Sequence, residues 1–404
     1  MGARSQDVGT QSDPKTLERR RRSLRGTSLL TVLFALVALI AAASLSIDVG
    51  VVLLARTQAQ NASDAAALAA AATMIDPTGP SVTIPAAETS ATSIAGSNWA
   101  VANASVAIDP ADITFGDWDL TTRTFDASVD QSDPYQVTAV DVVARLDGVT
   151  NGPVPAFMSK VLGRQDFDVS SRSTAYLGFA GNFGPGEIDL PVAIDCCKLR
   201  GPSCEDDYCA TVASPPNACP LDDPQTTGPN TVSCLEFHNT AEQNACWTQF
   251  DGDSPSINTS ELRDIVEDGS AVEITVPWPA YVDNGDKTPV IGEIKDRFMG
   301  EGGYVGKGEG IDFYADSGGS TPDSWVVRLP VINCQTADHC AGGTPATIIG
   351  AVCFEIREID VTPDKIIRGT FMCPGHPRWS ECEINGTGGG GNFGIIADIP
   401  VLVR

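Results

Sequence analysis

The residues with the most chemistry to offer are the twelve cysteines, all of which lie between Cys196 and Cys382, in roughly the second half of the chain. In a reducing cytosol so many thiols would suggest zinc, whereas outside a membrane they suggest disulfides. Paired C-x-x-C groups would be a strong zinc signal, and the sequence has none; the nearest fragments are "CPGH" (Cys373–His376) and "HC" (His339 and Cys340). We therefore expect disulfides, provided that this half lies outside the cytoplasm.

The candidates for disulfide bonding are spread along this cysteine-containing part of the chain. We expect the adjacent Cys196 and Cys197 to bond to two different partners, because a ring closed by neighbouring cysteines is strained. Twelve cysteines allow on the order of ten thousand pairings, so the sequence leaves the connectivity open. The candidates are Cys196, Cys197, Cys204, Cys209, Cys219, Cys234, Cys246, Cys334, Cys340, Cys353, Cys373 and Cys382.

Signals for catalysis or cofactor binding are weak. The histidines His238, His339 and His376 lie in cysteine-rich stretches without a G-x-S-x-G or H-E-x-x-H motif. Gly386–Gly391 matches G-x-G-x-x-G, but no βαβ unit surrounds it, so we expect a flexible loop. "DGDSPS" (Asp251–Ser256) begins like a calcium loop but places a proline where a ligand belongs. We therefore expect no enzyme, and assign no catalytic, cofactor-binding or metal-binding residue. Weak calcium binding by the acidic surface stays open.

An apolar segment near the N-terminus has the length of a membrane span. Leu29–Ile47 contains no charge, and as a helix it would cover roughly 28 Å, close to the hydrocarbon thickness of a bilayer. We expect this segment to span the cell (inner) membrane once. A basic cluster directly before it predicts that the N-terminus lies in the cytoplasm and the rest of the chain outside it. This topology signal consists of Arg19, Arg20, Arg21, Arg22 and Arg25.

A cleaved signal peptide is the alternative, since "AAAS" (Ala41–Ser44) offers an A-x-A cleavage site. Against it, the apolar run continues past that site. No proline occurs between Pro14 and Pro77, so one helix could run from Leu29 to Met74.

Asp48 follows the span directly. We interpret it as the outer membrane boundary with an exposed carboxylate. The alternative is a buried partner for a cation on a neighbouring helix, because ionisable groups near the hydrocarbon edge are costly unless wetted or paired.

Small side chains repeat beyond the span with helical spacing. Ala62, Ala65, Ala69 and Ala72 share one face, on which a second helix could approach closely, either from another copy of the chain or from a partner. Ala67 is expected on the opposite face. The alternative is a solvated stalk in which alanine only favours the helix.

Several segments resemble one family. "SIDVG…ARTQAQNASDAAALAAAA", followed by "ITFGDWDLTTRTF" (Ile113–Phe125), "YQVTAVDVVARL" (Tyr135–Leu146) and "PVPAFMSKVLGRQDFDVSSRSTA" (Pro153–Ala175), is similar to TadG-like proteins (TadE/TadG family) of tight-adherence (Flp) pilus systems, over about residues 26–180. The resemblance implies a single-span envelope protein that works with a pilus machine. Two departures matter. Pilins of related systems are cut after a glycine and carry Glu five residues later, but the fifth residue after Gly26 is Thr31. Many TadG proteins also end in a von Willebrand A domain, whose metal site needs D-x-S-x-S, and "DVSSR" has Arg172 in place of the second serine.

The chain divides into four expected parts. These are a basic tail (1–25), a transmembrane helix that continues as an alanine-rich helix (26–76), a small α+β domain (77–180) and a mainly β, cysteine-rich domain (181–404). We expect helices at Ala86–Val101, at Thr288–Met299 and within "VPAFMSKVLG". Strands are expected at Ser105–Ile108, Ile113–Trp118, Val137–Arg145, Phe167–Ala175, Val272–Val276, Ala346–Ile356 and Lys365–Cys373, and at three segments that open with proline ("LPVAIDCC", "LPVINC" and "IPVLV"). The fold class is therefore α+β.

The charge of the body limits the possible partners. The chain carries −26 overall, and the first 25 residues carry about +4 by count, so the remainder carries about −30. Such a body would repel nucleic acid and anionic membrane surfaces, because both require phosphates to be neutralised by Lys or Arg. We expect a non-enzymatic scaffolding component of a Tad/Flp-type pilus or adhesion apparatus. Its expected partners are the membrane, pseudopilin-like or other pilus-assembly membrane proteins, and other copies of itself. The alternative is a membrane-tethered surface adhesin whose cysteine-rich part binds a ligand.

Overall fold

The computed structural model describes most of the chain. The described residues are 14–75, 82–100, 105–132, 136–200, 204, 218–220, 231–237, 243–250, 254–299, 313–314, 324–333, 340–373, 376, 378–382, 384 and 386–404.

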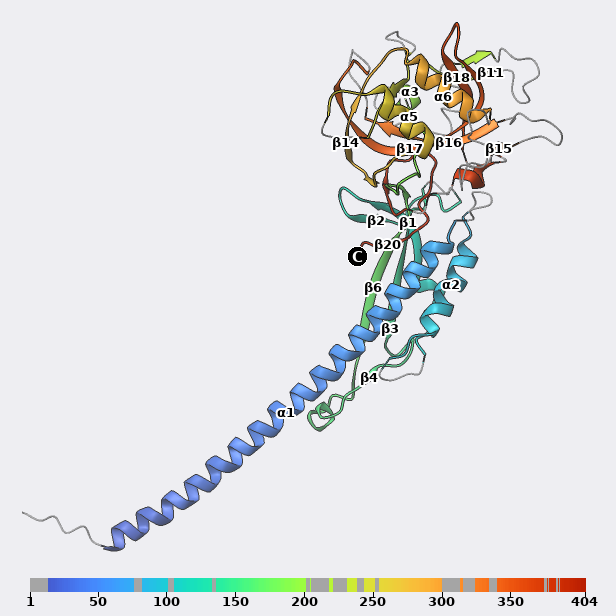
Figure 1. The fold of residues 1–404 in the computed structure, drawn as a ribbon. Helices are drawn as coiled ribbons and strands as arrows, with labels where there is room; N and C mark the ends of the chain where they lie inside the picture. Colours follow the sequence, from blue (N-terminus) through green and yellow to red (C-terminus); the bar gives the residue numbers. More distant parts are fainter. Residues whose placement is uncertain are drawn as a thin grey trace, which may run out of the picture.

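One long helix forms the N-terminal part. α1 (Pro14–Thr73) has 60 residues, which at about 1.5 Å each corresponds to roughly 90 Å. Its first half projects from the body as an isolated rod, and its second half lies along the folded part (Figure 1). Ser28–Thr73 is long and apolar enough to be a candidate membrane span. The predicted helix from Leu29 to Met74 lies within α1, which begins 15 residues earlier, at Pro14, and ends one residue before Met74.

A five-stranded antiparallel sheet packs against α1. Its strand order is β2-β1-β3-β6-β20, and β3 and β6 pair over eight residues from Ala139↔Tyr176 to Leu146↔Val169. α1 and α2 lie side by side on one face, where buried alanines of both helices meet Phe115 and Val140 of the sheet. Alanine suits this layer because small side chains let helix backbones approach closely. The elements are α2 (Ile84–Gly96), β1 (Ile113–Asp119), β2 (Thr124–Asp126), β3 (Ala139–Leu146), β6 (Val169–Tyr176) and β20 (Val401–Leu402).

Short elements decorate this sheet. The loop that leaves β3 forms a two-stranded pair around a 3-10 helix, which ends at Gly163 with φ 89°. The expected short helix in "VPAFMSKVLG" is therefore confined to its last residues. These elements are η1 (Pro110–Asp112), β4 (Val154–Pro155), η2 (Ser159–Leu162) and β5 (Asp166–Phe167).

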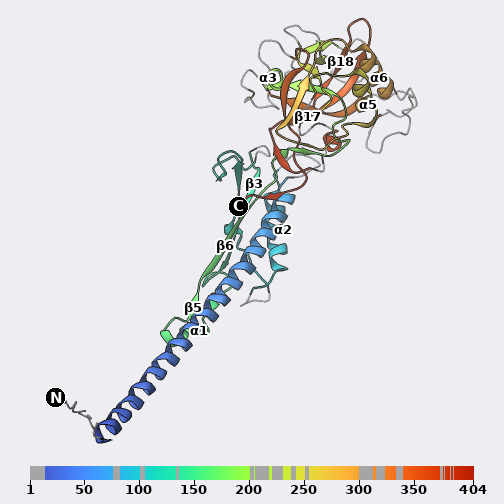
Figure 2. The same cartoon turned by 60° about the vertical axis from the view of Figure 1, so that its left-hand side comes forward.

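A larger, mainly β region follows. Its described strands run in the order β10-β11-β18-β17-β16-β9-β12, with β14 also pairing with β17 and β15 with β16. The pairings are antiparallel except for β16 with β9. α5 and α6 contribute Leu262, Val266 and Ile294 to the larger of its two cores, and they lie together on one side of the sheet (Figure 2). The elements are β9 (Val192–Asp195), α3 (Cys196–Arg200), β10 (Ala218–Pro220), β11 (Thr231–Leu235), β12 (Ala245–Trp247), α5 (Thr259–Asp268), β14 (Trp278–Val282), α6 (Thr288–Phe298), β15 (Phe313–Tyr314), β16 (Ser324–Ile332), β17 (Thr344–Asp360), β18 (Ile366–Phe371) and η3 (Trp379–Cys382).

The chain connects the two regions more than once. β7 (Phe179–Ala180) pairs with β19 (Gly388–Gly390), β8 (Asn182–Phe183) pairs with β13 (Ile274–Thr275), and the last strand returns to β6. A Cβ on Gly390 would lie 1.9 Å from the carbonyl oxygen of Ala180, so only glycine allows this approach. The expected flexible loop at Gly386–Gly391 is therefore wrong, because part of it is a paired strand.

Other expectations differ from the fold in informative ways. Ser105–Ile108 is not a strand, and Pro330 lies seventh in β16 rather than at its start. α5 was not expected at all; it begins at Thr259, after Asn258, whose side chain accepts the Ser260 N–H. The predicted helix at Ala86–Val101 begins two residues earlier and ends at Gly96.

Candidate functional site where the anchor helix meets the folded part

Asp48 lies where α1 first meets the rest of the chain, and its residue surface is 3% exposed. Its Oδ1 accepts the backbone N–H groups of Phe157 (2.8 Å) and Met158 (3.0 Å). Its Oδ2 accepts the N–H of Ser159 (2.6 Å) and the Ser159 hydroxyl. These N–H groups open η2, so Asp48 caps a short helix from a different element.

The expectation of an exposed carboxylate at this position is therefore wrong. The carboxylate is buried, as in the alternative, but its partners are backbone N–H groups and a hydroxyl rather than a cation. The role of Asp48 as the membrane boundary stays a prediction.

A polar seam joins α1 to the sheet about three helical turns beyond Asp48. Gln60 Nε2 donates to Asp64 Oδ1 (2.6 Å) and to Ser173 Oγ (2.9 Å), and Ser63 and Ser173 share a hydrogen bond of 2.7 Å. The hydroxyls of Ser171 and Ser173 donate to Gln60 and Asp64.

The spacing explains why these residues meet. Gln60, Ser63 and Asp64 lie three and four residues apart and so share a helix face, while Ser171 and Ser173 lie two apart and share a sheet face. The seam thus links two segments that the sequence places about 110 residues apart, "ARTQAQNASD" and "DVSSRSTA". Arg172, on the other face of β6, pairs with Asp141 at 2.7 Å.

The predicted helix-packing face is divided in the structure. Ala62 is buried within the chain, Ala65 and Ala69 are half-buried, and Ala72 is exposed. Ala67, expected on the opposite face, is fully buried against α2 and the sheet, whereas Ala72 is exposed. Contact with a second chain stays a prediction, and it now concerns the outer edge formed by Ala65, Ala69 and Ala72.

Nine of the twelve disulfide candidates are bonded in the described structure. The described pairs are Cys196–Cys204, Cys246–Cys340 and Cys353–Cys382, and Cys197, Cys234 and Cys373 are also disulfide-bonded. The prediction that Cys196 and Cys197 do not bond to each other is confirmed. Cys209 and Cys334 lie outside the described residues, as do His238 and His339, and the side chain of Cys219 in β10 is not described.

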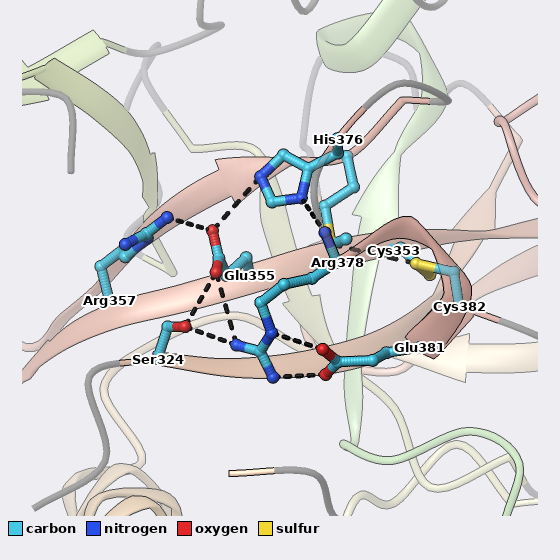
Figure 3. A network of polar contacts seen from close by, with 9 residues as sticks. Ser324, Cys353, Glu355, Arg357, His376, Arg378, Glu381 and Cys382 are labelled. Carbon is cyan, nitrogen blue, oxygen red and sulfur yellow. Dashed lines mark hydrogen bonds and ion pairs between the residues drawn. A yellow bond between two sulfur atoms is a disulfide. The ribbon is translucent and has the colours of Figure 1, made fainter. Parts of the chain in front are cut away.

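Glu355 of β17 centres a buried network beside the Cys353–Cys382 disulfide (Figure 3). The Ser324 hydroxyl donates to its Oε1 at 2.8 Å, and Arg357 contacts its Oε2. His376 Nε2 and Arg378 Nη1 each lie 3.4 Å from its carboxylate oxygens. Burial alone would raise the pKa of Glu355, but hydrogen bonds from His376 and Ser324 and the charge of Arg357 lower it from 4.5 to about 2.

This network binds one segment to the sheet. Ser324 is 1% exposed and its hydroxyl donates to Glu355. Arg378 also pairs with Glu381 of η3. The network and the disulfide thus fasten η3 to β17. Within the described ranges, no three His, Cys, Asp or Glu side chains are grouped so as to hold a metal ion.

The side chains of the topology signal, Arg19 to Arg25, lie in α1 but are not described. The functional residues that sequence reasoning missed are Gln60, Ser63, Asp64, Ser171 and Ser173. Their signal was available as polar side chains at helical and strand periods, but nothing in the sequence said that the two periods face each other.

Of three comparisons with known proteins, one found a match, and it covers the part of α1 that contains Asp48 and the seam residues. Searches of curated proteins and of solved structures each found no match. A scan against family models matched residues 26–73, which span most of α1 from the apolar segment to the alanine ladder and include Asp48, Gln60 and Asp64. The matching model is described as Flp pilus-assembly TadE/G-like, so residues 26–73, here called the TadE/G-like segment, are similar to that family.

Proposed function

We propose that the chain is a single-pass envelope protein that acts as a non-enzymatic scaffold in a Tad/Flp-type pilus-assembly or adhesion apparatus. The observation that carries this proposal is the direct continuity between the TadE/G-like segment and the folded part. Polar side chains of that segment bind β6 through the Gln60 and Asp64 seam. An anchor fixed along its length to a sheet holds the C-terminal region at a set distance from the membrane.

The proposed topology places the N-terminus in the cytoplasm and the folded regions outside the inner membrane. The basic cluster before the span and the disulfides of the C-terminal region support it. Alkaline phosphatase, which needs an oxidising compartment, should be active when fused after Arg404. An inactive fusion on a stable protein would contradict this orientation.

The proposed partner surface is the outer edge of α1 at Ala65, Ala69 and Ala72, which would receive a pseudopilin-like helix or a second copy. Ala72→Arg adds bulk and charge at an exposed position and should abolish co-purification of the partner and attachment to surfaces. Ala86→Arg, at an exposed alanine of the neighbouring helix α2, is the matched control and should have no effect.

Deleting the gene should remove surface pili while pilin subunits are still made, and the wild-type gene should restore them. Normal pili in the deletion strain would contradict the scaffold. The adhesin alternative is favoured by one feature, the position of the C-terminal region at the end farthest from the isolated helix (Figure 1). If the chain is an adhesin, the deletion strain should keep its pili and lose only attachment to surfaces.

A further inference from the structure

The apolar stretch of the isolated part of α1 matches one bilayer and ends where the folded part begins, which leaves no linker between membrane and folded part. From Ser28 to Ile47 the side chains are exposed apart from Ser44, which is half-buried. These residues cover about 30 Å as a helix, the thickness of the hydrocarbon core. Asp48, the next residue, already binds the folded part, so that part must begin at the membrane surface.

The segment that Asp48 binds, residues 156–164, is here called the foot. It lies between β4 and β5 at the end of the folded part nearest the isolated helix (Figure 1). Phe157 is 67% exposed although it is apolar and aromatic, and Lys160 and Arg164 are also exposed. Aromatic rings and long basic side chains are the groups that settle at a membrane–water interface.

The charge of the foot is opposite to that of the body. Lys160 and Arg164 are its only charged residues, giving about +2, whereas the chain after Gly26 carries about −30 by count. Anionic lipid headgroups attract basic residues that lie within a Debye length of the membrane surface. A basic segment in so acidic a body is therefore expected where the body meets lipid phosphate.

The polar backbone of the foot is paired in a way that suits an interface. Asp48 accepts three of its N–H groups, and the N–H groups of Ala156, Gly163 and Arg164 donate to carbonyl oxygens within residues 159–165. Unpaired N–H groups and unpaired carboxylates are costly near hydrocarbon. The hydrogen bonds from the N–H groups of Phe157, Met158 and Ser159 to Asp48, here called the clamp, satisfy both kinds of group at once.

The apolar surface of α1 also continues beside the foot. Val49 is 48% exposed and Leu53 is 57% exposed, and Leu53 lies about 8 Å beyond Asp48 along the helix, within the interfacial layer of a bilayer.

We propose that the foot is a second membrane contact, in which Phe157 enters the outer-leaflet interface and Lys160 and Arg164 meet lipid phosphates. With α1 as the first contact, this second one fixes the rotation and tilt of the folded part on the membrane. The inference rests on α1 spanning the bilayer and is independent of the pilus role.

The test uses the full chain in vesicles of phosphatidylcholine and phosphatidylglycerol, with some lipids carrying a nitroxide on the acyl chain close to the headgroup. Phe157→Trp adds one tryptophan to the six that the chain already has. Subtracting the wild-type emission gives the emission of the added residue. We expect a blue-shifted added emission that the nitroxide quenches about twofold or more, as for an interfacial aromatic residue. Leu120→Trp is the matched control, at an exposed apolar residue in the turn between β1 and β2, and should not be quenched.

Added emission from position 157 that matches the control at 120 would overturn the inference. Flotation of the same vesicles shows whether α1 is inserted: a chain that floats without quenching refutes the foot alone, and a chain that does not float refutes the span and the foot together. Changing both Lys160 and Arg164 to Glu should lessen the quenching. Unchanged quenching would overturn the phosphate contacts but not the insertion of Phe157.

Discussion

At the scale of single residues, Asp48 shows how a group with one expected role takes another. Replacing it by Asn keeps its size but turns NH₂ hydrogens towards N–H donors, so that the hydrogen bonds to Phe157 and Met158 or to Ser159 are lost. We expect local opening of the foot to become easier by about 1–3 kcal/mol, or roughly 5- to 150-fold faster amide exchange there. Hydrogen exchange measured by mass spectrometry on peptides covering residues 156–164 checks this.

Asp119→Asn is the matched control. Its carboxylate also accepts two backbone N–H groups, from Thr121 and Thr122, but in a remote turn. Exchange in the foot should not change, and equal exchange in both variants would contradict the clamp.

Glu355 makes a prediction about acid stability. Because its pKa is lowered from 4.5 to about 2, its contribution is fully present above pH 4.5 and is lost as the pH falls towards 2. Glu355→Gln should lower stability at pH 7 and make the stability of the variant fall less steeply between pH 5 and pH 2. Urea midpoints measured across this range check the slope. Glu273→Gln, at an exposed carboxylate, should keep the wild-type slope; the same slope in Glu355→Gln would refute this account.

At the scale of elements, the alanines of α1 predict where bulk is tolerated. Ala66 is fully buried against α2 and the sheet, so Ala66→Leu should destabilise the protein by about 1–3 kcal/mol through overpacking. Ala72→Leu carries the same change at an exposed position on the same helix and should cost little. Thermal unfolding followed by circular dichroism compares the two. Equal melting temperatures would show that α1 does not pack on the sheet.

At the scale of the whole molecule, the last strand closes a sheet built more than 200 residues earlier. Val401 packs near Trp118 and Tyr176, whereas its neighbour Leu402 is 42% exposed. Val401→Asp should therefore destabilise the five-stranded sheet by about 1–3 kcal/mol, and Leu402→Asp by much less. The emission of Trp118 during urea unfolding, isolated by subtracting the emission of matched chains that carry Trp118→Phe, reports on this sheet. Identical curves for the two variants would mean that β20 is dispensable there.

This return also bears on the expected division of the chain. The boundary at residue 180 stays a proposal, but β20 pairs with β6 on the near side of that boundary. A shortened chain that ended near residue 180 would lack one strand of its own sheet.

Features that depend on local pattern could be predicted from the sequence. An uncharged run after a basic cluster, a stretch without proline and alternating strands predicted α1, β1, β3 and β6, because hydrophobicity and backbone propensity act over a few residues. The cysteine count and the absence of C-x-x-C pairs predicted disulfides.

Which of these patterns face each other depends on tertiary contacts. The burial of Asp48 depends on a loop about 110 residues away, the inward side of the alanine ladder depends on where α2 lies, and the pairing of Gly390 depends on the approach of Ala180. Contacts between distant segments leave no local trace in periodicity, so the polar seam and the network around Glu355 could be recognised only once the chain was folded.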